Sequence, residues 1–341
     1  MIEKLLAERK LPEFKSREEM LEILQHEEYG YMPQKPEKTE FVKTLMCGDH
    51  FSMGGKSETY RLEVKTLVNG KEFSFPAMLV VPKKDGKIPF FVHIAFSGNV
   101  PDRYMPTEEI VDNGFAVLSF CYEDVTKDNA DFTDGLAGVL YKDGKRSSCD
   151  AGKLCMWAWA AQRLMDYAET DPKLDISCSC VCGHSRLGKT ALLTGATDER
   201  FSVSWSNNSG CSGAAITRDK CGENIFEITN RFPYWFCENY YKYRNKEHDL
   251  PFDQHFLIAS VAPRKVYVSS AKEDSWADPT SEFLCCVAAS EVFEKGFVHK
   301  NKLPETDEVY HAGDIGYHVR EGEHFMCRDD WKYVMEYIRK L

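Results

Sequence analysis

Ser185 stands at the centre of residues 178–190, after the alternating segment Cys-Ser-Cys-Val-Cys. Read as Gly183-x-Ser185-x-x-Gly188, the run is typical of a strained turn from strand to helix that lifts a nucleophilic hydroxyl clear of a sheet edge. The same residues also fit Gly-x-x-x-x-Gly-Lys-Thr, the pattern of a loop that cradles phosphate groups. The run therefore predicts either an acyl-transferring serine or a nucleotide-binding loop.

The rest of the chain argues against the phosphate loop. Such a loop needs a magnesium ligand, usually an acidic residue that closes a second apolar strand, and it normally opens the first strand-helix unit of its domain. Here the run follows several predicted strands, and the downstream segment 266–270 meets its first acid only at Glu273. Nucleotide binding stays as a remote alternative.

A nucleophilic serine needs a histidine base and a carboxylate that orients it, in the chain order serine, acid, histidine when the fold is an α/β hydrolase. Three acids follow the predicted strand 265–270, namely Glu273, Asp274 and Asp278. We favour Asp274, which lies four residues past the strand end. Asp278 is the second choice because its neighbour Pro279 indicates a helix N-cap, and Glu273 is the third.

The base is predicted to be His324, which precedes the last predicted helix, where this scaffold places it. His184 is too close to the serine in sequence to fold back onto it. His255 is interpreted as a hydrogen-bonding anchor for a loop segment. His311 and His318 flank the loop before His324 and are further candidates to line the cleft.

The elements that must position these residues alternate between apolar strands and amphipathic helices from residue 88 onward. Strands are predicted over 88–96, 115–121, 176–182, 201–206 and 265–270, and helices over 107–113, 151–169, 190–197, 279–295 and 329–340. This alternation implies right-handed parallel crossovers and an α/β fold with a doubly wound, mostly parallel sheet.

The N-terminal part of the chain lacks this alternation of strands and helices. A charged amphipathic helix is predicted over 13–26 and a turn-rich connector over 30–36. Residues 51–81 alternate around the turn Asn69-Gly70, which predicts an antiparallel hairpin at the sheet edge. We expect one domain over residues 1–341, with a lead-in over 1–50 and a loop-rich insertion over 209–253 above the strand ends.

The net charge and the cysteine content limit the kinds of partner and cofactor that the protein can have. The formal net charge of -11, from 43 basic and 54 acidic residues, gives no basic stripe for nucleic acid. No stretch approaches about 18 uninterrupted apolar residues, so we expect no membrane segment. The 13 cysteines include Cys178, Cys180 and Cys182 on one predicted strand, which is poor disulfide geometry and predicts reduced thiols. No spacing suits a zinc site, and we expect no metal and no cofactor.

As given, the sequence predicts a reduced compartment, the cytoplasm, because its N-terminal residues carry charges where a secretory apolar segment would lie. A secreted protein from which the signal peptide had been removed would read in the same way.

With these residues placed, the chain resembles the glucuronoyl esterases, carbohydrate esterase family 15, and in particular their bacterial members. The similarity runs from about residue 75 to the C-terminus. The motifs that carry it are Gly183-His184-Ser185-Arg186-Leu187-Gly188-Lys189, Arg231-Phe232-Pro233-Tyr234-Trp235-Phe236, Leu250-Pro251-Phe252-Asp253-Gln254-His255, Ala262-Pro263-Arg264, Asp274-Ser275-Trp276-Ala277-Asp278-Pro279 and Gly322-Glu323-His324.

The resemblance implies an α/β-hydrolase fold, a three-layer αβα sandwich around a mostly parallel sheet with an antiparallel N-terminal edge. It also implies hydrolysis of the ester that joins a 4-O-methyl-glucuronate carboxylate on xylan to an alcohol. The substrate would then be a small-molecule or oligosaccharide uronate ester, and we expect the protein to act as a monomer without cofactor.

Carried over by the resemblance, Ser185 is the nucleophile and the Arg186 guanidinium joins a backbone amide in the oxyanion hole. The resemblance also places Lys189, Glu223 and Trp276 at the sugar. Each has a plainer interpretation: Arg186 as a surface ion pair, Lys189 as a helix-surface lysine, Glu223 as a solvated loop carboxylate and Trp276 as a core residue.

The sequence departs from the family at two places. Many members have the triad glutamate where Asn208 stands, and because asparagine carries no charge the acid must come from elsewhere, which agrees with Asp274. Fungal relatives have a disulfide where this chain has His184 and Phe325. Two alternatives therefore stay open: an acetyl xylan esterase with the same triad, and a catalytically weak carbohydrate-binding relative.

Overall fold

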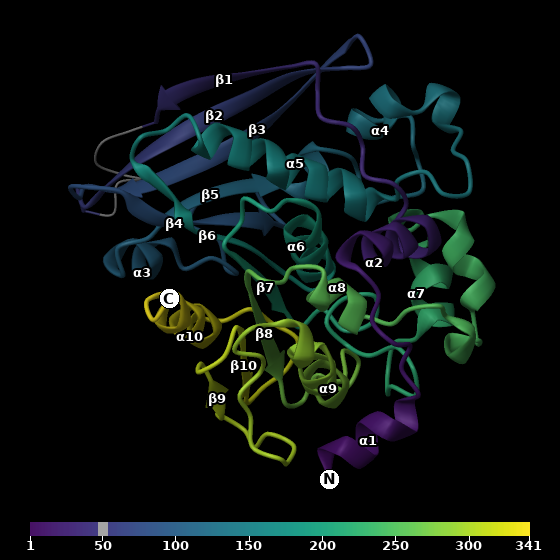
Figure 1. Ribbon diagram of the computed structural model, residues 1–341. Coiled ribbons are helices and arrows are strands. Elements are labelled where there is room, and N and C mark those ends of the chain that lie inside the picture. Colours follow the sequence, from purple (N-terminus) through teal and green to yellow (C-terminus); the bar gives the residue numbers. More distant parts are fainter. Residues whose placement is uncertain (47–53) are drawn as a thin grey trace.

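The computed structural model describes residues 1–46 and 54–341, and within them ten strands form one sheet in the order β1-β2-β3-β5-β4-β6-β7-β8-β10-β9 (Figure 1). The strands are β1 Lys38–Leu45, β2 Ser57–Val68, β3 Lys71–Pro82, β4 Ile88–Ala95, β5 Ala116–Cys121, β6 Leu174–His184, β7 Val203–Asn207, β8 Lys265–Ala271, β9 Val309–Tyr310 and β10 Ile315–Arg320. Strands β5, β4, β6, β7, β8 and β10 pair in parallel, and the strands outside them are antiparallel.

Helices connect the parallel strands, as the alternation predicts. In the described part of the chain the α-helices are α1 Ile2–Arg9, α2 Arg17–Leu24, α3 Thr107–Asp112, α4 Gly135–Leu140, α5 Lys153–Ala168, α6 Arg186–Thr197, α7 Ile225–Arg231, α8 His255–Ala259, α9 Pro279–Ala289 and α10 Arg328–Ile338. The expected α/β architecture is confirmed. Helix α6 begins earlier than expected, directly after the serine, and α9 ends earlier, at Ala289.

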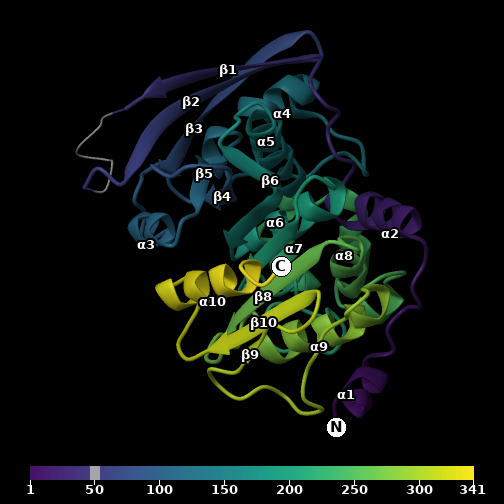
Figure 2. The same cartoon turned by 60° about the vertical axis from the view of Figure 1, so that its left-hand side comes forward.

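Helices cover both faces of the sheet, so that the fold has three layers (Figures 1 and 2), and an apolar core lies between the sheet and the helices on each face. Helices α5, α6, α8 and α9 pack on one face, where α5 is buried on nearly every side. Helices α3 and α10 cover the other face. There the ring of Trp331 lies 5.0 Å from that of Phe91 and 4.8 Å from that of Trp205, edge to face. Each such pair adds about 1 kcal/mol to burial, so α10 is pinned beneath the strands that carry the site.

The antiparallel edge starts from the predicted hairpin. Strands β2 and β3 meet at Asn69 and Gly70, whose φ angles of 49° and 70° suit a two-residue turn that asparagine and glycine adopt readily. Residues 51–53 of the predicted hairpin lie outside the described residues. The sequence analysis missed β1, which pairs outside β2 and has only exposed or half-exposed side chains, so its apolar alternation is weak.

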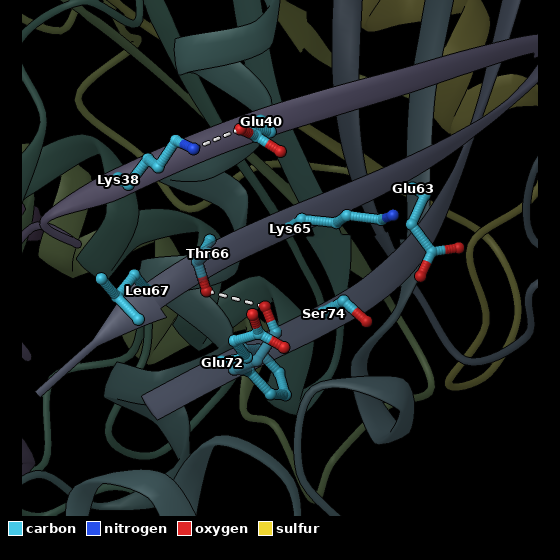
Figure 3. Close-up of a pocket in the computed structure, with 9 residues that line it drawn as sticks. Lys38, Glu40, Glu63, Lys65, Thr66, Leu67, Glu72 and Ser74 are labelled. Carbon is cyan, nitrogen blue, oxygen red and sulfur yellow. Dashed lines mark hydrogen bonds and ion pairs between the residues drawn. The ribbon is translucent and has the colours of Figure 1, made fainter. Parts of the chain in front are cut away.

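The outer surface of β1, β2 and β3 has a hollow of about 790 Å³ (Figure 3). Side chains such as Lys38, which pairs with Glu40 at 2.5 Å, and Lys65 line it. These are ordinary outward residues of an exposed sheet face. Ser185, Asp274 and His324 do not line this hollow, so its volume does not make it the reaction site.

The N-terminal helix prediction over 13–26 is wrong in its bounds. Helix α2 starts after Ser16, whose hydroxyl accepts from the N–H of Glu19 while the Glu19 side chain accepts from the N–H of Ser16. This capping box satisfies two free donors and sets the helix start. The helix then continues as a π-helical turn, Gln25–Tyr29, and α1 precedes it. In the described residues no helix has both the length and the apolar character to cross a membrane.

Candidate active site

Ser185 lies at the junction between β6, which ends at His184, and α6, which begins at Arg186. Its backbone has φ 58° and ψ -127°, a conformation that residues with a side chain rarely adopt. A Cβ on Gly183 would approach the carbonyl oxygen of Leu187 to 2.4 Å, so only glycine allows the turn to close this tightly. The geometry is that of a nucleophile elbow, in which the hydroxyl stands beside the first amides of a helix.

The loops after β8 and β10 bring an acid and a histidine to the same place. Nδ1 of His324 lies 2.6 Å from Oδ2 of Asp274, and His324 lines the same cavity as Ser185. Asn208 donates its amide to Oδ2 of Asp274 at 2.9 Å, and the N–H of Ala277 donates to Oδ1 at 3.2 Å. Burial opposes ionisation of Asp274, but these hydrogen bonds outweigh it and lower the pKa of the carboxyl below its usual value.

The structure separates the three acids that sequence left open. Asp278 caps α9, accepting from the N–H of Ser281 at 3.1 Å, the capping role that its proline neighbour indicates. Glu273 is exposed. Asp274 alone of the three hydrogen-bonds to His324, among the contacts of the described residues. It is the acid placed to orient the imidazole.

The other histidines have structural partners. His184 donates from Nδ1 to Oδ1 of Asn207 at 2.6 Å and lies 4.5 Å from the His324 ring, and burial with the nearby His324 lowers its pKa to about 3. His255 bonds to the carbonyl of Pro12 at 3.0 Å. His184 is therefore a neutral neighbour of the base, and His255 anchors the N-terminal segment.

The interpretation of His311 and His318 as cleft residues is wrong. His318 lies on β10, fully buried between the hydroxyl of Tyr267 at 2.9 Å and Oδ1 of Asp330 at 2.8 Å. His311 shares the Tyr267 hydroxyl at 3.0 Å. Strand β10, which carries His318, was not predicted from the sequence, and the residues before His324 were taken for a loop. His311 follows β9, and both rings meet at the Tyr267 hydroxyl.

The Arg186 guanidinium is held in place by one carboxylate and by contacts with aromatic rings. Its Nη1 pairs with Oδ2 of Asp128, and its guanidinium carbon lies 4.8 Å from the centre of the Trp235 ring and 5.4 Å from that of Phe232. Its Nε is buried and has no hydrogen-bond partner in the part of the chain that the structure describes. The Arg186 side chain lines the same cavity as Ser185, while its Nε itself is enclosed by protein atoms.

The cavity itself has a volume of about 210 Å³. Besides Ser185, Arg186 and His324, its walls come from α6, from the loop after β7, from the insertion and from the loop after β8. These residues are Lys189, Asn208, Ser209, Gly210, Glu223, Arg231, Phe232, Trp235, Trp276 and Ala277. A space of this size, lined by three basic side chains, the Glu223 carboxylate and two indole rings, suits a polar ring such as a sugar.

Comparison with known proteins decides the family. The family described as "Glucuronyl esterase, fungi" matches residues 64–296. The chain belongs to the glucuronoyl esterase family. The members of this family are carboxylic-ester hydrolases, and the fold and the enzyme class that the sequence resemblance implies are confirmed.

Individual glucuronoyl esterases and their relatives agree along almost the whole chain. Carbohydrate esterase MZ0003 of an unknown prokaryotic organism is 33% identical, over 95% of this chain and 83% of its own length. The structure of a promiscuous CE15 esterase from a marine bacterial metagenome superposes with a TM-score of 0.84 at 31% identity, covering 95% and 91% of the two chains. Glucuronoyl esterase from Solibacter usitatus gives 0.85 at 30%, covering 95% and 92%. This chain spans 55% of the length of the Podospora anserina 4-O-methyl-glucuronoyl methylesterase, at 28% identity.

The three sugar-binding candidates that the glucuronoyl esterase resemblance implies all line the cavity. Lys189 is 3% exposed, donates to the carbonyls of Ser209 and Cys211, and has its ammonium 3.7 Å from Oε2 of Glu223. Trp276 is 44% exposed, so it is a rim residue and not a core residue. Lys189 is likewise not a surface lysine. Its ammonium donates hydrogen bonds to two backbone carbonyls and forms an ion pair with the Glu223 carboxylate.

Two partners in this glucuronoyl esterase site escaped the sequence analysis. Asn208, noted only as a residue that cannot be the acid, hydrogen-bonds to the acid. Asp128, the partner of Arg186, lies in a segment with no catalytic pattern. The ring residues Phe232 and Trp235 were quoted as part of a motif without a role. Their presence in that motif was the available signal, whereas nothing local marks Asp128.

Proposed function

We propose that this protein hydrolyses an ester of (4-O-methyl-)glucuronate on xylan-derived saccharides through a Ser185-His324-Asp274 acyl-enzyme mechanism. The single observation that carries the proposal is the 2.6 Å contact between His324 Nδ1 and Asp274 Oδ2, beside a cavity shared with Ser185. With Nδ1–H bound to the carboxylate, the proton-free Nε2 can take the proton of the serine hydroxyl.

In the first step the Ser185 oxygen attacks the uronate carbonyl carbon, and His324 takes the hydroxyl proton. The negative charge that develops on the carbonyl oxygen is stabilised by the Arg186 guanidinium and by the backbone N–H of the same residue. The first amides of a helix have no intrahelical partner. A donor aimed at such an oxyanion lowers the barrier by about 3 kcal/mol in comparable sites.

The tetrahedral intermediate then collapses, and His324 returns the proton to the departing alcohol. An acyl-enzyme remains, with the uronate carbonyl bound to the serine oxygen. Water attacks that carbonyl, His324 accepts a proton from it, and the second collapse releases the uronic acid and restores the serine. The charge that forms on the imidazole in each half is balanced by Asp274.

We assign the sugar to Lys189, Glu223 and Trp276. The Glu223 carboxylate, oriented by Lys189, would accept from ring hydroxyls, and the exposed indole edge would cover the uronate ring. The relative described as 4-O-methyl-glucuronoyl methylesterase supports the uronate as acyl group. We further propose a monomer without a nucleic-acid partner. The twelve cysteines within the described ranges are all free, which supports a reducing compartment.

The test compares Ser185→Ala with the unmodified protein on the methyl or benzyl ester of glucuronate and on an acetylated xylo-oligosaccharide. We expect turnover of the uronate ester to be lost in Ser185→Ala, with the melting temperature unchanged. Wild-type kcat in that variant would overturn the mechanism. A clear preference of the unmodified protein for the acetyl ester would overturn the substrate. A fluorophosphonate that labels Ser185 would exclude a carbohydrate-binding protein without a reactive serine.

A further inference from the structure

The carboxylate that pairs with Arg186, that of Asp128, is held in a fixed position in the site. Asp128 has an 8% exposed side chain. Its Oδ2 accepts from Arg186 and, at 3.1 Å, from the hydroxyl of Tyr122, while its Oδ1 accepts from the indole N–H of Trp235 at 2.7 Å. Both oxygens are thus occupied, which fixes the direction of the carboxylate.

The backbone around Asp128 is also held. The fully buried ammonium of Lys153, on α5, donates to the carbonyl of Asp131 at 2.6 Å and to that of Lys127. The hydroxyl of Tyr234 donates to the carbonyl of Asp128 itself at 3.0 Å. Because the segment is tied on both sides, the carboxylate cannot swing away when a ligand enters the cavity.

A fixed anion beside Arg186 matters because the reaction changes the charge of its substrate. The ester that enters is neutral at the reacting carbon, whereas the acid that leaves is a carboxylate. An unpaired guanidinium next to the nucleophile would bind that carboxylate strongly, since arginine and carboxylate match in geometry and charge. The enzyme would then be inhibited by its own product.

The other charged groups that line the cavity follow the same arrangement. Lys189 is paired with Glu223, and His324 with Asp274. Arg231 stands apart at the exposed end of α7, where solvent and salt screen its charge. Arg186 is the cation next to Ser185, so Asp128 is the anion on which the local charge balance depends.

We propose that Asp128 is a specificity-determining residue that lets the uronate product leave: it keeps the Arg186 guanidinium as an oriented hydrogen-bond donor while cancelling its net charge. The inference rests on the proposed uronate esterase function. It predicts that removal of the Asp128 charge tightens binding of the acid and leaves binding of the ester nearly unchanged.

The experiment uses the full chain in a Ser185→Ala background, so that both ligands can be measured without turnover. Calorimetry gives the Kd of glucuronate and of its methyl ester, with and without Asp128→Asn. We expect the acid to bind about tenfold or more tightly in Asp128→Asn, because one charge about 6 Å away at an effective dielectric near 20 is worth up to about 100-fold. The Kd of the ester should stay within about threefold, and the gain for the acid should shrink as salt is raised.

Two variants serve as controls. Asp124→Asn removes the same charge from an exposed position four residues earlier and should leave both Kd values unchanged. Asp128→Glu keeps the charge and should keep the wild-type ratio of acid to ester affinity. Should Asp128→Asn fail to fold, as judged by its melting curve, Asp128→Ser removes the charge with a smaller side chain and is measured in the same way.

The outcomes separate the inference from the function on which it rests. An unchanged ratio of acid to ester affinity in folded Asp128→Asn overturns the inference, as does an equal loss of both, which would make Asp128 only a support for Arg186. If neither compound binds to the Ser185→Ala protein and the unmodified enzyme does not hydrolyse the ester, the proposed function itself fails. A tighter acid with an unchanged ester supports both.

Discussion

The contacts of Asp274 determine what an amide in its place would do. Oδ2 accepts from both His324 and Asn208, and Oδ1 accepts from the N–H of Ala277. In Asp274→Asn the amide NH₂ must replace one of these oxygens. At the Oδ1 position it faces the N–H of Ala277. At the Oδ2 position it faces the amide of Asn208 and forces His324 into the tautomer that carries its proton on Nε2, which cannot accept the proton of Ser185.

Either orientation removes the negative charge that balances the imidazolium. Two opposite charges about 4 Å apart at an effective dielectric near 20 interact by about 4 kcal/mol, equivalent to about 10³ in rate. The His324 side chain is 42% exposed, so water screens part of this interaction. We therefore expect kcat on a glucuronate ester to fall by about 10²–10³ with KM little changed, the pattern of an interaction that strengthens only in the transition state.

Steady-state kinetics on the benzyl ester of glucuronate measures this, with Ser185→Ala as the inactive baseline and a melting curve to show that the variant folds. Asp278→Asn is the matched control: the same chemical change at a helix N-cap, where asparagine and aspartate serve about equally well, should leave kcat within threefold. If instead Asp274→Asn stays within threefold of wild type, the reasoning is refuted and the acid must be sought at Asp278 or Glu273.

A second, compensating substitution tests whether a negative charge from another residue restores the activity. In Asp274→Asn/Asn208→Glu the charge returns from the neighbouring loop, at the residue whose amide hydrogen-bonds to Asp274. We expect recovery of at least tenfold over Asp274→Asn. The recovery should be partial because residue 208 has φ 47°, a conformation that costs glutamate about 1 kcal/mol relative to asparagine or glycine. No recovery would show that the two loops are not interchangeable sources of the charge.

Three further outcomes are expected. The Arg320 guanidinium donates to backbone carbonyls on both sides of His324. We therefore expect Arg320→Met to lower kcat at least tenfold, and we expect glucuronate still to bind when the same change is made in the Ser185→Ala protein. An equal loss of kcat and of glucuronate binding would contradict a positioning role. Burial raises the pKa of Glu282 to about 7, so the folded protein keeps a proton that the unfolded chain releases above pH 4.5. Stability should therefore fall by up to about 3 kcal/mol between pH 5 and 8 through this group, and denaturant titrations of Glu282→Gln should show a flatter profile. Gly183→Ala should destabilise the fold by about 3 kcal/mol or more, and an unchanged melting temperature would refute the tight packing of the elbow.

The fold class could be predicted from the sequence alone because the evidence for it is local. Apolar strands that alternate with amphipathic helices specify parallel crossovers wherever they occur, and Asn69-Gly70 determines the hairpin turn by its own backbone preference. The serine between two glycines and the serine-acid-histidine order along the chain pointed to the proposed catalytic residues for the same reason. Strand β1 was missed because its exposed side chains leave little apolar pattern, and β10 because a fully buried strand has no alternation.

Only the tertiary structure decided which side chains meet. The sequence ranked three acids within six residues but did not place any of them at the histidine. Packing of the loop after β8 turns one toward His324, 50 residues away, and another onto the N-terminus of α9. The pairing of Arg186 with Asp128 joins residues 58 positions apart in segments that share no motif. Such contacts depend on how whole elements pack, because a hydrogen bond needs its atoms placed within a few tenths of an ångström, and no local preference of the chain sets that distance.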